Sequence, residues 1–493
     1  MLILKIAKRI LGVITSAVCT FTVCTAALSM GVSAASGTVG DMTYVSYDDH
    51  VEITDCAGSA TTVTIPSEIL NLPVTVIADS AFEDCASLSQ VVIPDSVTEI
   101  GDYAFNGCSA LQGVSIPDTV TSVGASAFRG TYIVDIQSGP VYYVSNWAVQ
   151  STSATAVEIK SGTIGIADST FYNKGLETVS IPTSVVTIGN SAFADNTDIR
   201  EVSVTSGVKT IGNNAFADCT SLLKVTIAST VTSIGAGAFY NCSALKGIKI
   251  PDSVTSIGYD AFKYTYDYSN QTGPEIYIDT WVVNCLDSNE NLAVNIKSGT
   301  KGIADRAFQD KTFVISASIP SGVKTIGAYA FSGCTSLSQL SLADTLTSIG
   351  NYAFASTKIP TVVLPASVAS IGYAAFYNCA NLTDITIANS SCAIYDSAKT
   401  IYSGAKMHVA EKSTAYDYAI KYNRTFDYIT TVLVVKGDVT GNGKLDLYDA
   451  IAICKDIMGI AKLTAEQQKV ADITGDGVIN LYDAIEIAKA LLA

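Results

Sequence analysis

The chain has 493 residues, 48% of them hydrophobic, and is long enough to form several domains with large cores. Its formal net charge of −16 at pH 7 argues against binding to nucleic acid or to an anionic membrane surface. Only two histidines occur, His50 and His408, which argues against histidine-based zinc sites and against Ser-His or Cys-His catalysis.

Residues 1–34 have the features of a signal peptide. A basic segment with Lys5, Lys8 and Arg9 precedes a long apolar run, and small residues place the expected cleavage near Ala34. The apolar run is also long enough for an uncleaved anchor, and this alternative stays open. No later segment resembles a membrane span, so none is expected in the mature chain. We therefore predict a secreted protein that is extracellular or attached to the cell surface.

Residues 40–63 alternate apolar and polar residues and are predicted to form a hairpin that caps the segment after it. From 64 to 392 the chain repeats a unit such as VVIPDSVTEIGDYAFNGCSALQG (91–113). A phenylalanine recurs in this unit at steps of 22 or 23 residues, except for two steps of 43 and 46. Such a period predicts a solenoid, and one hidden turn in each long step gives about fourteen turns. The phenylalanines are Phe82, Phe105, Phe128, Phe171, Phe193, Phe216, Phe239, Phe262, Phe308, Phe331, Phe354 and Phe376.

Each repeat unit is interpreted as one turn of the solenoid. In the unit shown, a short strand ends at Pro94, Gly101 permits a turn, and Phe105 fills the core. One turn cannot bury its apolar face alone, so stacked neighbours complete the core. Six cysteines lie three residues after a phenylalanine, which favours a ladder of buried thiols over disulfide bridges. These are Cys85, Cys108, Cys219, Cys242, Cys334 and Cys379.

The unit resembles the repeat of BspA-like bacterial leucine-rich-repeat proteins over about residues 60–390, through its I-P-x-S-V-x-x-I-G-x-x-A-F-x-x-C-x-x-L pattern. This resemblance implies a mixed α/β fold, a leucine-rich-repeat solenoid. Residues 393–428 are similar to the closing segment of that family and are expected to form a C-terminal cap. Residues 429–435 are then a linker to the last module.

Two irregular segments match each other at an offset of 134 residues, so a block of six turns is predicted to be duplicated. They contain both tryptophans of the chain. Tyr143, Trp147, Tyr277 and Trp281 are candidate ligand contacts, since exposed aromatic rings stack on sugar rings or on a partner protein. The alternative is that Trp147 and Trp281 replace the missing phenylalanine in the core.

Two stretches near the C-terminus fit a twelve-residue calcium loop: DVTGNGKLDLYD (438–449) and DITGDGVINLYD (472–483). Positions 1, 3, 5, 9 and 12 carry oxygen side chains, position 6 is glycine, and position 7 offers a backbone carbonyl. A hard cation takes six to eight oxygens, so two loops in register, each followed by an apolar helix, predict two Ca²⁺ ions. The predicted ligands are Asp438, Thr440, Asn442, Lys444, Asp446, Asp449, Asp472, Thr474, Asp476, Val478, Asn480 and Asp483.

Loop followed by helix, twice, with Asp at position 12, resembles the dockerin type I module over about residues 436–493. The resemblance implies a small all-α calcium-binding module and, as partner, a cohesin domain on a scaffoldin or surface protein. In that family, loop positions 10 and 11 and the following helix carry recognition. The matching residues are Leu447, Tyr448, Leu481, Tyr482, Lys455 and Lys489. The alternative for the Leu-Tyr pairs is packing in the core of the module itself.

No catalytic constellation stands out, because the acidic residues and the Ser-Gly pairs fall at repeat turns. We expect a non-catalytic binding protein that presents a repeat surface to protein or glycan. Its calcium-dependent dockerin would dock to a cohesin on a cellulosome-type or cell-surface scaffold. Two other functions stay open: a surface adhesin for host or neighbour-cell protein, and a carbohydrate-active or peptidase component of a cellulosome.

Overall fold

The structure is a computed structural model that describes residues 35–288, 290–429, 439, 447–460, 462–463, 465–473 and 478–492. The predicted signal peptide and residues 430–435 of the predicted linker lie outside the described residues. Within the described part, no helix is long and apolar enough to cross a membrane.

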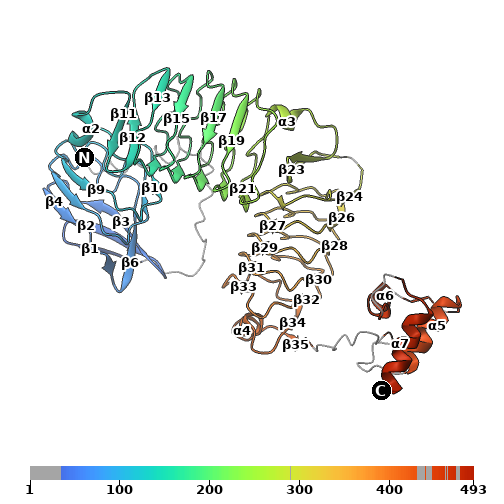
Figure 1. Cartoon of the computed structure of the whole chain (residues 1–493). Coiled ribbons are helices and arrows are strands. Elements are labelled where there is room, and N and C mark those ends of the chain that lie inside the picture. The colour runs from blue at the N-terminus through green and yellow to red at the C-terminus, as the bar shows by residue number, and fades with distance from the viewer. Residues whose placement is uncertain are drawn as a thin grey trace.

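Residues 35–429 form one continuous β-solenoid. It curves from the blue N-terminal strands to the orange C-terminal ones (Figure 1). Short parallel strands from successive turns pair along one side. The first sheet contains β1 (Ala35–Val39), β2 (Met42–Ser46), β3 (Val51–Cys56), β5 (Glu68–Ile69), β6 (Leu72–Ile77), β8 (Glu99–Ile100) and β10 (Ser122–Val123). The second contains β11 (Val141–Val144), β12 (Trp147–Ser151), β14 (Gly165–Ile166), β16 (Thr187–Ile188), β18 (Thr210–Ile211), β20 (Ser233–Ile234) and β21 (Ser256–Ile257). The third contains β22 (Glu275–Ile278), β23 (Trp281–Cys285), β25 (Gly302–Ile303), β27 (Thr325–Ile326), β29 (Ser348–Ile349), β31 (Ser370–Ile371) and β33 (Ala393–Ile394).

A second strand in most turns builds shorter sheets on another side of the solenoid. Its residues alternate exposed and buried, as in Lys224, Val225, Thr226 and Ile227, because successive side chains of a strand point to opposite faces. These sheets contain β4 (Thr62–Thr64), β7 (Gln90–Val92) and β9 (Gly113–Ser115); β13 (Ala156–Glu158) and β15 (Thr178–Ser180); β17 (Glu201–Val204) and β19 (Lys224–Ile227); β24 (Leu292–Asn295), β26 (Val314–Ile319) and β28 (Gln339–Leu342); and β30 (Thr361–Leu364), β32 (Asp384–Ile387), β34 (Lys406–Val409) and β35 (Phe426–Tyr428).

The phenylalanines of the repeat form the centre of the core, as predicted. All are buried, and neighbouring rings stack with centroids 4.7–5.5 Å apart. The stacked series runs from Phe82 to Phe128, from Phe171 to Phe262 and from Phe308 to Phe376. The solenoid has about 16 turns rather than fourteen, because the turns through β3 and β33 carry no phenylalanine. In the last of these, Ile401 pairs with Phe376 instead.

The cysteines at the repeat position form the predicted ladder of buried thiols. The Sγ of Cys108 donates to the carbonyl of Phe82 at 3.0 Å, and Cys334 donates to Phe308 at the same distance. Burial raises the pKa of both thiols to about 12, so they stay protonated at neutral pH. Asn196 takes this position in one turn, and its buried amide bonds to five backbone groups.

An Asp or Asn ladder links the turns at a second repeat position. The Oδ1 atom of Asp102, for example, accepts the backbone N–H of Ala125 in the next turn at 2.7 Å. The same contact is made by Asp79, Asp168, Asn190, Asn213, Asp305 and Asn351. The neighbouring Gly101 is needed for close approach rather than for a special turn, since a Cβ there would lie 2.6 Å from the nitrogen of Asp79.

The two ends of the solenoid are closed by different elements. At the N-terminus β1, β2 and β3 form an antiparallel meander, and β3 then pairs in parallel with β6. At the C-terminus α4 (Thr414–Lys421) packs beside β33 and β34. The Ser413 hydroxyl caps this helix by accepting the N–H of Tyr416.

Candidate functional sites

The two irregular segments are built to the same plan, as their sequence match predicts. Each begins with a short helix, α2 (Tyr132–Asp135) or α3 (Tyr266–Ser269), and continues into an antiparallel hairpin, β11–β12 or β22–β23. A glutamine fastens helix to hairpin: Gln137 Nε2 donates to the carbonyls of Ile133 and Tyr143, both at 2.7 Å. Gln271 makes the matching contacts in the second segment.

Both tryptophans lie in the core, so neither is available as a ligand contact. Trp147 is 1% exposed and Trp281 is 2% exposed. Each ring lies against a glycine of the next turn: a Cβ at Gly165 would come within 2.4 Å of Trp147, and one at Gly302 within 2.4 Å of Trp281. The indoles therefore belong to the buried core at the paired strands, and the interpretation of Trp147 and Trp281 as ligand contacts is corrected.

The two candidate tyrosines are half-buried and held in place. The hydroxyl of Tyr143 accepts the backbone N–H of Lys160 at 3.1 Å, and Lys160 Nζ lies 4.2 Å from the ring centroid. Tyr277 and Lys297 repeat this arrangement at 3.1 and 4.1 Å. One ring face of each tyrosine is thus occupied by a cation, and a role in ligand contact stays a prediction.

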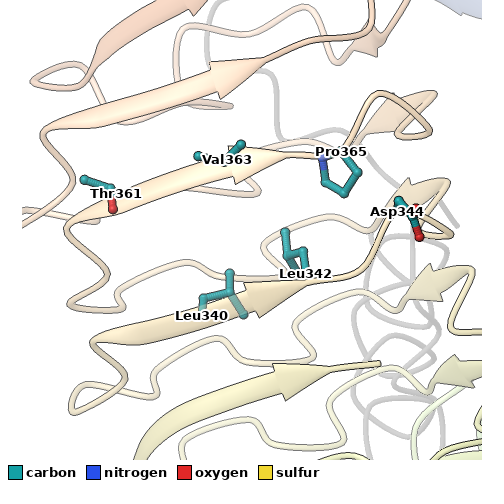
Figure 2. Close-up of a pocket in the computed structure, with 6 residues that line it drawn as sticks. All are labelled: Leu340, Leu342, Asp344, Thr361, Val363 and Pro365. Carbon is teal, nitrogen blue, oxygen red and sulfur yellow. The ribbon is translucent and has the colours of Figure 1, made fainter. Parts of the chain in front are cut away.

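A shallow pocket of about 310 Å³ lies where the sheet is open between β28 and β30 (Figure 2). Pro360 explains the opening. It lies one turn before Thr383 at the same repeat position, where the N–H of Thr383 donates to the preceding turn. Proline has no N–H and cannot make the matching bond to its own preceding turn. Leu340 and Leu342 are consequently half-buried, and Val363 is 69% exposed. The pocket is shallow, and Asp344 and Thr361 line it together with the apolar side chains of Leu340, Leu342, Val363 and Pro365.

The C-terminal module packs three helices: α5 (Leu447–Ile457), α6 (Ala465–Ala471) and α7 (Leu481–Leu492). Its core is small and includes Val439, Ile453 and Ile487. The last residue of each predicted calcium loop, Asp449 or Asp483, lies in the first turn of α5 or α7 and is completely buried. A buried carboxylate is costly unless other charges or donors compensate it, so this placement fits a cation bound at each loop.

The second loop shows how its end is organised. The N–H of Asn480 donates to Asp483 Oδ2 at 2.8 Å, and Asn480 Oδ1 accepts the N–H of Tyr482 at 2.8 Å. Asp472 is half-buried at the start of the loop. These oxygen donors suit a hard cation. The described residues alone contain no group of three or more His, Cys, Asp or Glu side chains set to hold a metal. The remaining predicted ligands lie outside the described residues: Asp438, Thr440, Asn442, Lys444, Asp446, Thr474 and Asp476.

The predicted partner residues of the second half lie on the surface. Leu481 is 56% exposed and Tyr482 is 71% exposed, so this Leu-Tyr pair does not pack in the core of the module. Ile485 and Lys489 continue the same face one and two turns along α7, and Lys489 pairs with Glu486 at 2.6 Å. Lys455 is exposed on α5, while the side chains of Leu447 and Tyr448 lie outside the described residues.

Family models match both parts of the chain. The BspA type leucine rich repeat region matches in six copies, over residues 75–163, 142–269 and 301–410, which together exceed half of the chain. The chain belongs to this family. The dockerin type I domain matches residues 436–492, so the helical module is a dockerin. Both are non-catalytic kinds of domain, and dockerin type I domains bind calcium.

Three solved structures are similar to the chain. A leucine-rich repeat protein from Bacteroides ovatus ATCC 8483 is 22% identical, covers 80% of this chain and 100% of its own, and has a TM-score of 0.25. A leucine rich cell surface protein from Faecalibacterium prausnitzii A2-165 is 23% identical over 80% and 95%, with a TM-score of 0.27. A leucine rich repeat protein from T. pallidum is 28% identical over 43% and 88%, with a TM-score of 0.23. No curated protein matches the chain. With TM-scores this low, the family assignment rests on the repeat sequence.

Proposed function

We propose that the chain is a secreted, non-catalytic binding protein with two working parts. Its dockerin binds two calcium ions and docks to a cohesin on a cellulosome-type or cell-surface scaffold. Its solenoid presents a surface for contact with protein or glycan. The long solenoid supports a display role, because three continuous clusters of buried side chains hold its turns together.

One observation carries the docking part of the proposal. The face of α7 that begins with Leu481 and Tyr482 is apolar and exposed, and it follows directly on the loop that ends at the buried Asp483. Calcium at the loop fixes the start of the helix, and the helix holds the apolar face in position. Removing the ions leaves the carboxylates of each loop to repel one another, so calcium loss should undo the docking surface.

The test is binding of the chain to a panel of cohesin domains, with calcium and with excess chelator. Asp438→Ala combined with Asp472→Ala should abolish binding, because the first ligand of each loop is lost. Asp95→Ala with Asp118→Ala is the matched control, since it removes the same charge from exposed sites on the solenoid. Cohesin binding that persists in excess chelator would contradict the proposal.

A second set of variants separates recognition from calcium binding. Changing Leu481, Tyr482, Leu447 and Tyr448 together to Ser should weaken cohesin binding while the calcium titration still reports two ions. All four are changed because the two halves are nearly identical in sequence, so one half can replace the other in docking. Unchanged cohesin affinity would move recognition to another face of the module.

A further inference from the structure

A polar pocket of about 320 Å³ lies at the second irregular segment, on the solenoid. Its volume is near the lower end of the roughly 300–1,000 Å³ range of small-ligand sites. Donors and acceptors from three separate turns meet there. Those that matter for its chemistry are Tyr259, Lys263, Asn284, Arg306, Gln309 and Asp310.

The pocket exists because one turn of the solenoid lacks the segment that carries the phenylalanine in a regular turn. This is the turn through β23. Because the segment is missing there, the two flanking turns meet directly on that side. There the N–H of Asp305 donates to the carbonyl of Ile257 at 2.9 Å, across 48 positions of sequence. Asn284 of β23 reaches the edge of the gap and bonds to the hydroxyl of Tyr268 at 2.5 Å. Side chains of the flanking turns therefore face an unfilled space.

Arg306 is the most distinctive group in this pocket. Its guanidinium lies between two tyrosine rings, 4.8 Å from the centroid of Tyr259 and 5.0 Å from that of Tyr329. Its one hydrogen bond is a long contact from Nη1 to Gln309 Oε1 at 3.4 Å. Among the described residues, no carboxylate lies within ion-pair distance of it. The rings fix the plane of the guanidinium and leave most of its donors for a ligand.

The charges around the pocket balance. Three cations, Lys263, Arg306 and Lys311, face three carboxylates, Asp260, Asp305 and Asp310. Both lysines are already engaged: Lys263 pairs with Asp260 at 3.0 Å, and Lys311 with Asp287 at 2.6 Å. An anionic ligand would gain Arg306 but would also meet the exposed carboxylate of Asp310. A neutral ligand whose hydroxyls both donate and accept matches this mixed set better.

The duplicated block provides an internal comparison. At the matching positions of the first irregular segment, Ala125 replaces Tyr259, Ser169 replaces Arg306 and Asn173 replaces Asp310. The ring–guanidinium–ring stack cannot form there. The helix, the hairpin and the buried tryptophan are nevertheless shared by both segments, so the fold does not require the stack. The residues of the pocket are thus specific to one of two segments that share a common scaffold.

We propose that this pocket binds a sugar residue of a neutral polysaccharide, with Arg306, Asn284 and Asp310 bonding to its hydroxyls. The proposal rests on the glycan-contact role of the solenoid proposed above and assigns that role to one place. Tyr259 and Val283 line the pocket and supply apolar contact for the sugar's C–H groups.

The test uses the full secreted chain with calcium and measures binding by calorimetry. The probes are hexasaccharides of cellulose, xylan and mannan, with a galacturonate hexamer as the acidic comparison. Arg306→Ser introduces the residue found at the matching position of the first irregular segment, Ser169. It should weaken the affinity for a neutral hexasaccharide at least tenfold. Ser169→Ala, at that matching position of the first segment, should leave the affinity unchanged. Asp310→Asn, at an exposed site, is a second variant that removes one acceptor without disturbing the stack. Fluorescence of the buried Trp147 and Trp281 reports that the variants are folded.

Each outcome bears on the proposal. Neutral hexasaccharide binding that falls in Arg306→Ser supports it. It is overturned if only the galacturonate hexamer binds, or if no hexasaccharide binds. Glycan binding that Arg306→Ser leaves intact also overturns the pocket assignment, although the broader glycan-contact function then stands. Cohesin docking is measured separately on the same protein, so failure of the pocket and failure of the dockerin are distinguishable.

Discussion

The carboxyl group of Asp168 is expected to lower the stability of the solenoid at neutral pH. It lies in the ladder between turns, where Oδ1 accepts the N–H of Asn190 at 2.6 Å and Oδ2 accepts from Asn190 Nδ2 at 2.8 Å. Burial, together with the nearby charges of Asp102 and Glu99, outweighs these bonds and raises its pKa from 3.8 to about 7. Asparagine occupies this repeat position elsewhere, so Asp168→Asn tests the charge with little change in shape.

The size and sign of the effect follow from linkage. Because the folded-state pKa lies above the unfolded-state value, the penalty is absent below about pH 4, grows up to about pH 7 and is complete above it. At about 1.36 kcal/mol per pKa unit, the full penalty is about 4 kcal/mol. Losing the bond from Asn190 Nδ2 offsets about 1 kcal/mol of the gain. Asp168→Asn should therefore stabilise the region by roughly 2–3 kcal/mol at pH 8.

Tryptophan fluorescence is a local assay for this region. In a Trp281→Phe background, Trp147 is the only tryptophan, and its turn bonds to the turn of Asp168 through the N–H of Ala167. Urea unfolding followed by Trp147 at several pH values should show the stabilisation by Asp168→Asn at pH 8 shrinking towards pH 4. Asp118→Asn, at an exposed position, is the control. A stabilisation that does not change with pH, or a less stable variant at pH 8, would refute the reasoning.

Three other predictions concern the packing of the solenoid. Gly302→Ala should lower the free energy of unfolding by about 1–3 kcal/mol, because the new Cβ meets the ring of Trp281; Gly58→Ala, in open space, should have little effect in the same urea titration. Asn196→Ala should lower that free energy by about 2–4 kcal/mol, since five backbone groups lose a hydrogen bond, whereas Asn196→Cys restores the usual residue and should cost less. Under native conditions a thiol reagent should label Cys454, the one half-buried cysteine among the described residues, and the rest only after unfolding; a lower total would show that bridges form.

The regular part of the molecule is predictable from sequence because every turn repeats the same local demands. The phenylalanine period fixes the length of the turn, and the cysteine three residues later marks a buried position that any small residue with a partner can fill, as Asn196 does. The two predicted calcium loops also rest on spacing alone, and their ligands stay a prediction. Both patterns are visible in the sequence because each residue type recurs at a fixed spacing.

The irregular segments are less predictable because their contacts join residues far apart in sequence. The burial of Trp147 depends on Gly165, and the sequence alone left the indole either in the core or on the surface. The sequence does not predict the stack of Tyr259 on Arg306. The stack forms only where one turn lacks the phenylalanine segment and the flanking turns meet. A comparison of the two duplicated blocks could have suggested it, because Tyr259 and Arg306 are changed together from Ala125 and Ser169.

This distribution of contacts explains why a binding site is expected at an irregular segment and not along the regular turns. In a regular turn the phenylalanine, the cysteine position and the Asp or Asn ladder all contact the neighbouring turn, so a change that removes one of these contacts costs stability. At the irregular segments the buried tryptophan closes the core with help from one glycine, and the side chains across the gap are left free to vary. Of the two matching irregular segments, only the second has a guanidinium held between two tyrosine rings. A solenoid that must stay rigid while acquiring a ligand site can do so at least cost at such a gap.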